Sequence, residues 1–183
     1  MQNKLAIDRF KSPIGEVFLV ARGDRLCSVD FVDYEERMEK LLARRYRDCS
    51  LRHERNPGGV TALLRAYFEG DLAATENIGV EFHGTPFQET VWRALRDIPA
   101  GTTETYGRLA ARIGRPTASR AVGHANSQNP IAIVVPCHRV IGANASLTGY
   151  AGGIHRKRWL LDHESGVDGL FQPTPAGDSN HQA

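Results

Sequence analysis

The first thirty residues carry their hydrophobic positions in short runs separated by turn residues. Apolar side chains cluster at 5–10, 17–20 and 26–31, and the stretches 12–15 and 22–24 between them contain Pro, Gly and Asp. Such runs predict β-strands, and the short connections predict hairpins. We therefore expect an antiparallel meander at the start of the chain.

The hydrophobic period then changes to that of helices. One face is formed by Met38, Leu41, Leu42 and Tyr46 after a capping Asp30 or Asp33, and another by Val60, Leu63, Leu64, Tyr67 and Phe68. Both sets match helical spacing, and Gly70 ends the second helix. A short strand is expected at 78–82, while Cys49 falls in a polar connection. No grouping of reactive side chains occurs in this half, so a packing role is expected for it.

The second half of the chain predicts helices around one strand. Thr85 is placed to cap a helix with Phe87, Val91, Trp92, Leu95 and Ile98 on its apolar side, and 99–101 ends it. The stretch 83–86 therefore separates domains 1–84 and 85–165. A last helix is expected at 155–164, and the tail 166–183 has too little apolar content to fold.

Two short helices joined by a tight connection are expected after the helix that Thr85 caps. They span 106–114, opened by Thr103 or Thr105, and 118–126, with Arg115-Pro116-Thr117 between them. This spacing is typical of a helix-turn-helix. The second helix carries Ala118, Ala121, Gly123 and Ala125. Small side chains permit either a close approach to a DNA minor groove or tight packing between helices, and the pattern leaves both open.

The apolar, largely β-branched run 131–135 predicts a buried strand that ends at Pro136. Cys137, His138 and Arg139 follow at its exit. A thiol beside basic groups loses its proton more readily, which favours the nucleophilic thiolate near neutral pH. Adjacent strand residues point to opposite faces, so Cys137 and His138 cooperate only if the chain turns here or a water bridges them. A lone cysteine is otherwise most often part of a core.

The distribution of charge along the chain indicates a kind of binding partner. The 183 residues carry a formal charge of +2, but residues 86–165 hold 10 Lys and Arg against 5 Asp and Glu. Between 104 and 140 the basic residues are Arg108, Arg112, Arg115, Arg120 and Arg139, against the single acid Glu104. This excess suits a phosphate backbone, although an ordinary solvated face has the same composition.

The three cysteines bear on compartment and metal content. Cys27, Cys49 and Cys137 form no C-x-x-C pair, which favours free thiols in a reducing compartment. No apolar run is long enough to span a bilayer, and early charges exclude a secretory segment, so a cytoplasmic location is expected. Cys27, Cys49, His53 and His83 lack zinc-ligand spacing, and no metal is expected.

The string Pro136-Cys137-His138-Arg139-Val140, with Gly149-Tyr150 and then 156–164, resembles the active-site region of the O6-alkylguanine-DNA alkyltransferases, in their constitutive bacterial form. The similarity runs from about Pro86 to Glu164 and more loosely through the N-terminal half. It implies an α+β protein. The N-terminal α/β domain would be ribonuclease-H-like with an antiparallel sheet, and the C-terminal domain mostly helical, winged-helix-like and built around the helix-turn-helix.

The resemblance also implies a reaction. Cys137 would take the alkyl group from O6-alkylguanine in double-stranded DNA, and less well from O4-alkylthymine. The target base would first flip out of the duplex. Each molecule would react once and would need no cofactor. His138 would accept the thiol proton through a water, and Glu164 would orient His138. Tyr106 would protonate the leaving base, while Asn129 would fix the turn before the active site.

The remaining site residues belong to DNA and base binding. Arg120 would enter the base stack and Tyr150 would line the base pocket. The other expected contacts with DNA or the base are Ser119, Ala121, Gly123, Arg139, Val140 and Ala151. Of these, Arg139 is more suited to bracing the local backbone. The minor groove would be bound with little sequence choice, by monomers acting singly or cooperatively. Two departures from relatives stand out: Ala145 occupies a common glycine position, and Ala151 replaces a serine found in some members.

Three alternative functions share parts of this pattern. A non-catalytic DNA-lesion binder would have the same fold but lack the cysteine, and Cys137 argues against it. A cysteine hydrolase would bring its histidine from a distant part of the chain. A DNA-binding regulator is compatible with the helix-turn-helix and would bind a specific operator.

Overall fold

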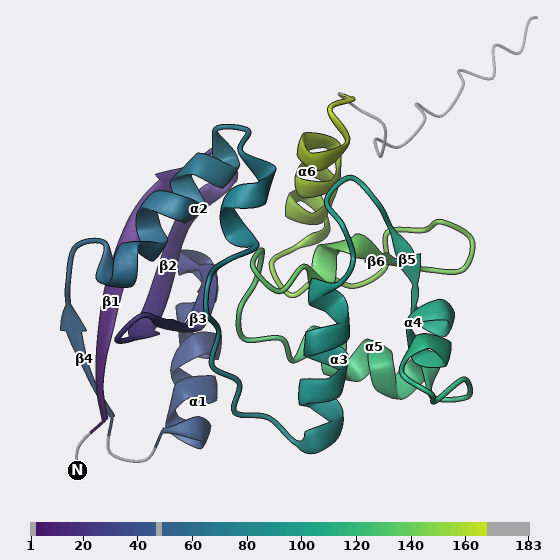
Figure 1. The fold of residues 1–183 in the computed structure, drawn as a ribbon, viewed down its shortest axis with the longest axis horizontal. Coiled ribbons are helices and arrows are strands. Elements are labelled where there is room, and N and C mark those ends of the chain that lie inside the picture. Colours follow the sequence, from purple (N-terminus) through teal and green to yellow (C-terminus); the bar gives the residue numbers. More distant parts are fainter. Residues whose placement is uncertain (1–2, 47–48, 168–183) are drawn as a thin grey trace, which may run out of the picture.

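The computed structural model describes residues 3–46 and 49–167, and residues 168–183 of the expected tail 166–183 lie outside them. An N-terminal sheet with its helices packs beside a mostly helical C-terminal part, and the last helix returns to the boundary between the two (Figure 1). The predicted α+β class is confirmed.

The N-terminal sheet contains β1 (Asn3–Ser12), β2 (Gly15–Arg22), β3 (Arg25–Phe31) and β4 (Cys49–His53), in the order β3-β2-β1-β4. The first three strands form the predicted antiparallel meander, and two-residue turns join Ser12 to Gly15 and Arg22 to Arg25. β4 pairs with β1 in parallel. The sheet is thus mixed rather than wholly antiparallel.

Strand β2 is buried on both faces because helices cover the sheet from two sides. Val17 and Leu19 belong to the larger core with α2 (Val60–Phe68), whereas Phe18 and Val20 pack in a second cluster with α1 (Glu35–Arg45). Successive strand residues point to opposite faces, which explains the unbroken apolar run. Short 3₁₀ turns at Val32–Tyr34, Pro57–Gly59 and Leu72–Thr75 connect these elements.

The N-cap of α1 is Tyr34, so neither Asp30 nor Asp33 caps that helix, and two expectations about strands in this half were also wrong. The segment with Cys49 is strand β4 and not a connection, because its backbone pairs with β1 although its side chains are half-buried or exposed. The segment 78–82 is not a strand: it makes a single parallel bridge from Val80 to Leu26, with hydrogen bonds to Leu26 from Glu81 and from Leu26 to Gly79. Backbone pairing therefore overrode local side-chain pattern at both places.

The C-terminal part contains α3 (Pro86–Arg96), α4 (Tyr106–Arg112), α5 (Ser119–Ser127) and α6 (Ile154–Ser165). Thr85 caps α3 in a capping box with Gln88, and Thr105 caps α4, as their sequence positions predict. α4 and α5 form the helix-turn-helix. Two-residue strands β5 (Glu104–Thr105) and β6 (Val140–Ile141) pair in parallel beside it.

The strand expected at 131–135 is absent, and this changes how the reactive residues are delivered. Ile131 makes one bridge to Val29, after which the chain turns. Ile133 has a φ of 72° inside a three-residue turn closed by Val134 N and Ala132 O at 2.8 Å. Pro136 then centres an inverse γ-turn, with Cys137 N and Val135 O at 2.8 Å. The side chain of Asn129 holds this path, accepting from Ile131 N at 3.0 Å and donating to Val135 O at 2.8 Å.

Ala145 adopts the left-handed conformation, with a φ of 59°. A Cβ is unfavourable there, so Ala145→Gly is expected to raise the free energy of unfolding by up to about 1 kcal/mol. Urea unfolding measures this. The matched control is Ala143→Gly, at an exposed position of the same loop where φ is not positive, which is expected to be neutral or destabilising. Equal effects at both positions would contradict the strain at Ala145.

Candidate active site

Cys137 begins a single 3₁₀ turn (Cys137–Arg139) immediately after the turns set by Asn129. The chain therefore turns at the thiol, which is the condition under which adjacent residues 137 and 138 can act together. The side chain is buried, with 5% of the residue exposed. Burial raises the pKa of the Cys137 thiol, against the opposing effects of Asn129, Lys157 and Arg37. The expectation of a lowered thiol pKa was wrong at this buried position, so the thiol is neutral at rest.

His138 is completely buried and bound to a carboxylate. Its Nε2 lies 2.8 Å from Glu164 Oε1, while its Nδ1 has no protein partner among the described residues. Burial lowers the pKa of His138 more strongly than Glu164 raises it, and Arg139 and Lys157 lower it further. The imidazole is therefore neutral near pH 7. With Nε2–H donating to Glu164, the lone pair on Nδ1 is available to accept a proton.

Glu164, from α6, is held by two side chains of the Cys137–Arg139 turn. Arg139 donates from Nη2 to Oε1 at 2.8 Å and from Nε to Oε2 at 2.9 Å. Burial alone would raise the pKa of Glu164, but His138 and Arg139 outweigh it and hold that pKa far below its usual range. Arg139 is itself buried and also donates to Ile98 O, so it braces this region instead of facing a DNA surface.

Two tyrosines lie close to the thiol. Burial raises the pKa of Tyr106, and it raises the pKa of Tyr150 far more. Both phenols are therefore protonated donors at neutral pH. The Tyr150 hydroxyl is buried without a protein partner among the described residues. Gly152 permits this packing, because a Cβ there would lie 2.7 Å from the Tyr150 ring.

Sequence patterns missed three other groups around Cys137. Lys157 is fully buried, donates to Val140 O at 2.6 Å and Thr148 O at 2.8 Å, and has its pKa lowered to about 8 by burial. Asn126 Nδ2 donates to Cys137 O at 3.4 Å. Nothing in the helical pattern around Asn126 indicated a role near the thiol. Lys157 was indicated only by its place in the 156–164 string. Val140 was expected among the DNA contacts. It is buried instead, and its carbonyl accepts the hydrogen bond from Lys157.

The third missed group couples the domains. Arg37 from α1 pairs with buried Asp30 and donates to Ser127 O at 2.9 Å and Asn129 O at 3.0 Å. The turn that delivers Cys137 is therefore held from the N-terminal domain as well. No sequence period connects residues so far apart.

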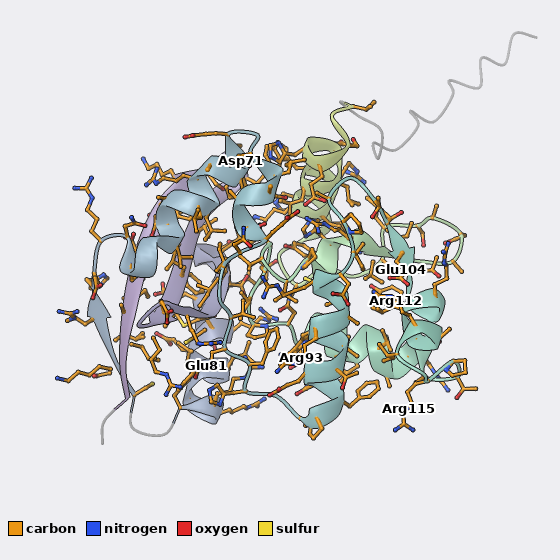
Figure 2. The ribbon with its side chains drawn as sticks, in the orientation of Figure 1. Asp71, Glu81, Arg93, Glu104, Arg112 and Arg115 are labelled. Carbon is orange, nitrogen blue, oxygen red and sulfur yellow. The ribbon has the colours of Figure 1, made fainter. Side chains whose placement is uncertain are left out.

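The residues expected to touch DNA lie mainly on the outer side of α5. Arg120 and Ala121 are exposed and Ser119 and Gly123 are half-buried. A Cβ at Gly123 would meet the Tyr106 ring at 3.7 Å, an ordinary contact, so tight helix packing does not require this glycine. Figure 2 labels Arg115 at the connection from α4 to α5, and places Arg112 beside Glu104, to which it donates at 2.9 Å. Arg112 is thus engaged within the protein.

Two findings concern metals and membranes. Residues 3–46 and 49–167 contain no cluster of three or more His, Cys, Asp or Glu side chains arranged to hold a metal ion. None of the helices described is long and apolar enough to cross a bilayer.

The fold and site together define a helix-turn-helix domain with a buried cysteine, histidine and glutamate behind it. Two family models match the chain. They describe the ribonuclease-like domain of 6-O-methylguanine DNA methyltransferase over residues 8–82, and its DNA-binding domain over residues 86–166. The chain belongs to the 6-O-methylguanine DNA methyltransferase family.

Individual proteins of this family are also similar to the chain. A methylated-DNA–protein-cysteine methyltransferase of Salmonella typhimurium is 49% identical over 166 residues, covering 88% of this chain and 96% of the relative. The Mycobacterium tuberculosis protein of the same name is 45% identical, covering 84% and 88%. The crystal structure of Mycobacterium tuberculosis OGT in complex with DNA has a TM-score of 0.75 at 42% identity, covering 89% and 93%.

Proposed function

We propose that Cys137 is the acceptor in direct reversal of DNA alkylation, taking the alkyl group from O6-alkylguanine in duplex DNA. Family membership makes the chain a methylated-DNA–protein-cysteine methyltransferase of DNA repair, with DNA as its partner. One observation carries the assignment of roles. A buried thiol is followed by a neutral histidine whose Nε2 is bound to Glu164 and whose Nδ1 has no hydrogen-bond partner in the part of the chain that the structure describes.

The chemistry follows from these protonation states. Because the Cys137 thiol is neutral at rest, a base must take its proton as attack begins, and His138 Nδ1 does so through a water. The Cys137 sulfur forms a bond to the alkyl carbon while the bond from that carbon to guanine O6 breaks. The electron pair passes into the purine, and the Tyr106 phenol donates a proton to a ring nitrogen. Guanine is released neutral within the DNA strand and Cys137 becomes a thioether, and the proton taken up by His138 returns through water to the Tyr106 phenolate.

Glu164 stabilises the imidazolium that forms on His138, the role of the acid in other nucleophile, base and acid sets. Burial raises the pKa of Tyr106, so the phenol is protonated at neutral pH and gives up its proton only as negative charge develops on the purine. A thioether does not revert in neutral water, so each molecule reacts once and inactivates itself. No cofactor enters any step.

Access to the buried thiol requires the target base to leave the duplex. Arg120 is exposed on α5 and its planar guanidinium can take the place of the extruded nucleotide in the stack. The small residues of α5 support a close approach along the minor groove with little sequence choice. We assign Ser119, Ala121 and Gly123 to this contact, and Tyr150 and Ala151 to the base pocket. The enzyme acts in the cytoplasm as a monomer, and O4-alkylthymine is a poorer substrate.

Intact-protein mass spectrometry tests this function. The protein is mixed with a duplex that contains one O6-methylguanine, and the peptides are then mapped. The expected result is a gain of one methyl group, confined to Cys137 and stopping at one per molecule. An unchanged mass with retained binding would instead establish a lesion binder or a regulator.

Ala121→Leu tests the minor-groove contact. Ala121 is exposed, so leucine disturbs no packing, but its bulk holds α5 away from the duplex. Duplex binding is expected to weaken about tenfold, which corresponds to roughly 1.4 kcal/mol. Fluorescence anisotropy with a labelled duplex measures it. Ala43→Leu, at an exposed position of α1, is the matched control and is expected to bind normally. Normal binding by both variants would contradict the contact.

A further inference from the structure

Tyr67 in the N-terminal domain contacts the catalytic carboxylate directly. The Tyr67 hydroxyl, from α2, donates to Glu164 Oε1 at 2.7 Å, and both residues are buried. We propose that Tyr67 is a positioning residue for alkyl transfer, which acts through Glu164 to set the orientation and proton affinity of His138. This inference rests on the proposed function of His138 as the base.

The hydroxyl competes with His138 for the same oxygen. Glu164 Oε1 accepts from Tyr67, from His138 Nε2 at 2.8 Å and from Arg139 Nη2 at 2.8 Å. Each donor withdraws negative charge from the carboxylate. Without the phenol, the carboxylate would attract the proton of a charged His138 more strongly. Tyr67 therefore lowers the basicity of the carboxylate, and keeps His138 neutral and ready to accept a proton.

The Tyr67 ring is fixed where it can do this. Its edge contacts are to Phe68, with ring centroids 5.4 Å apart, and to His163, at 5.3 Å. The His163 ring stacks on Trp159 at 4.7 Å, and His163 Nε2 lies 2.8 Å from Tyr67 O. These contacts tie α2 to α6, the helix that carries Glu164. Because the ring is packed on several sides, the hydroxyl has a defined direction.

Other charged and titratable groups face His138, Glu164 and Tyr67 from the packed elements. Arg139 from the 3₁₀ turn acts on both His138 and Glu164, and Lys157 from α6 acts on His138, while His163 from α6 and Tyr150 from its loop lie near Tyr67. Arg139 and Lys157 favour neutral His138, whereas Glu164 favours the charged form. All of these groups remain when only the Tyr67 hydroxyl is removed. A change in the pH dependence of the reaction then reports on that hydroxyl.

Tyr67→Phe removes the hydroxyl and keeps the ring, and Glu164 Oε1 retains two donors. The matched control is Tyr46→Phe, because Tyr46 is also buried in the N-terminal domain and donates to a carboxylate, Glu81, at 3.0 Å. Single-turnover transfer from an O6-methylguanine duplex is followed from pH 5 to pH 9. In parallel, the His138 imidazole is titrated by ¹⁵N NMR in the unreacted proteins.

For Tyr67→Phe we expect the His138 pKa and the acid limb of the rate profile to move upward by about half a unit, the direction of a more basic carboxylate partner. The greatest rate falls about tenfold, because Glu164 loses one of the contacts that orient it and, through it, His138. Tyr46→Phe leaves both unchanged. Placing 3-fluorotyrosine at position 67, a stronger donor of similar size, moves the profile downward.

The outcomes separate this inference from the proposed function. If the unmodified protein gains no methyl group at Cys137, the proposed function fails, and the NMR titration still decides whether Tyr67 acts on His138. If transfer occurs but both substitutions at position 67 leave the profile and the titration unchanged, Tyr67 is only a packing residue and the inference is overturned. A lower melting temperature with an unchanged profile has the same meaning.

Discussion

Replacing Cys137 by serine is expected to abolish methyl transfer while duplex binding is retained. Serine has nearly the same shape, but its hydroxyl is a far weaker acid and a poorer nucleophile than the thiol. His138, whose pKa burial lowers, is too weak a base to compensate. The transfer rate is expected to fall by at least about a thousandfold, as when a catalytic nucleophile is removed elsewhere. Mass spectrometry against time, with anisotropy for binding, measures both.

Cys49→Ser is the matched control, because Cys49 is a free thiol on β4, outside the site. It is expected to react at the normal rate. A methyl group found on Cys27 or Cys49 in the Cys137→Ser protein would show that the acceptor was assigned wrongly. Loss of duplex binding in Cys137→Ser would mean that the cysteine also supports the fold of the DNA-binding domain.

Glu164→Gln is expected to be the most destabilising of the substitutions considered. It removes the negative charge opposite Arg139, a residue that is 7% exposed and donates two hydrogen bonds to that carboxylate. Breaking one side of a buried ion pair costs about 3–5 kcal/mol in the free energy of unfolding. Urea unfolding measures this loss. Methyl transfer also slows, because His138 loses the group that fixes its tautomer.

The loss is expected to depend on pH in a defined direction. The folded protein holds the pKa of Glu164 far below 4.5, its ordinary value. The stability that this provides is complete above the unfolded value and is lost as the pH falls toward the folded value. The difference between the unmodified protein and Glu164→Gln is therefore full at pH 7 and shrinks below about pH 4.5. A difference independent of pH would contradict an ionised Glu164.

Glu81→Gln is the matched control for Glu164→Gln. Glu81 also accepts from a tyrosine and an arginine, Tyr46 and Arg22, but Arg22 is 44% exposed in that pair. Solvent screens such a pair, so the loss is expected to be about 1 kcal/mol or less. Methyl transfer by Glu81→Gln is expected to be unchanged.

Much of the fold was predictable from local sequence. The meander, the capping box at Thr85 and the two helices of the helix-turn-helix depend on near neighbours in the chain, and the structure has all of them. The predicted strand at 131–135 failed for a clear reason. Its apolar side chains are buried as predicted, but the Asn129 side chain takes the backbone hydrogen bonds that a strand would use.

The candidate site, like the fold, was predictable from the sequence only in part. The sequence by itself determined the residue types, because Cys137, His138 and Arg139 are adjacent and Glu164 lies in the motif that follows. Only the tertiary structure decided their protonation states, since burial raises the thiol pKa that neighbouring basic groups suggested would fall. It also decided that Tyr67 reaches Glu164 across 97 positions of the chain. Electrostatic effects depend on distance and burial in space, which a local sequence pattern does not contain.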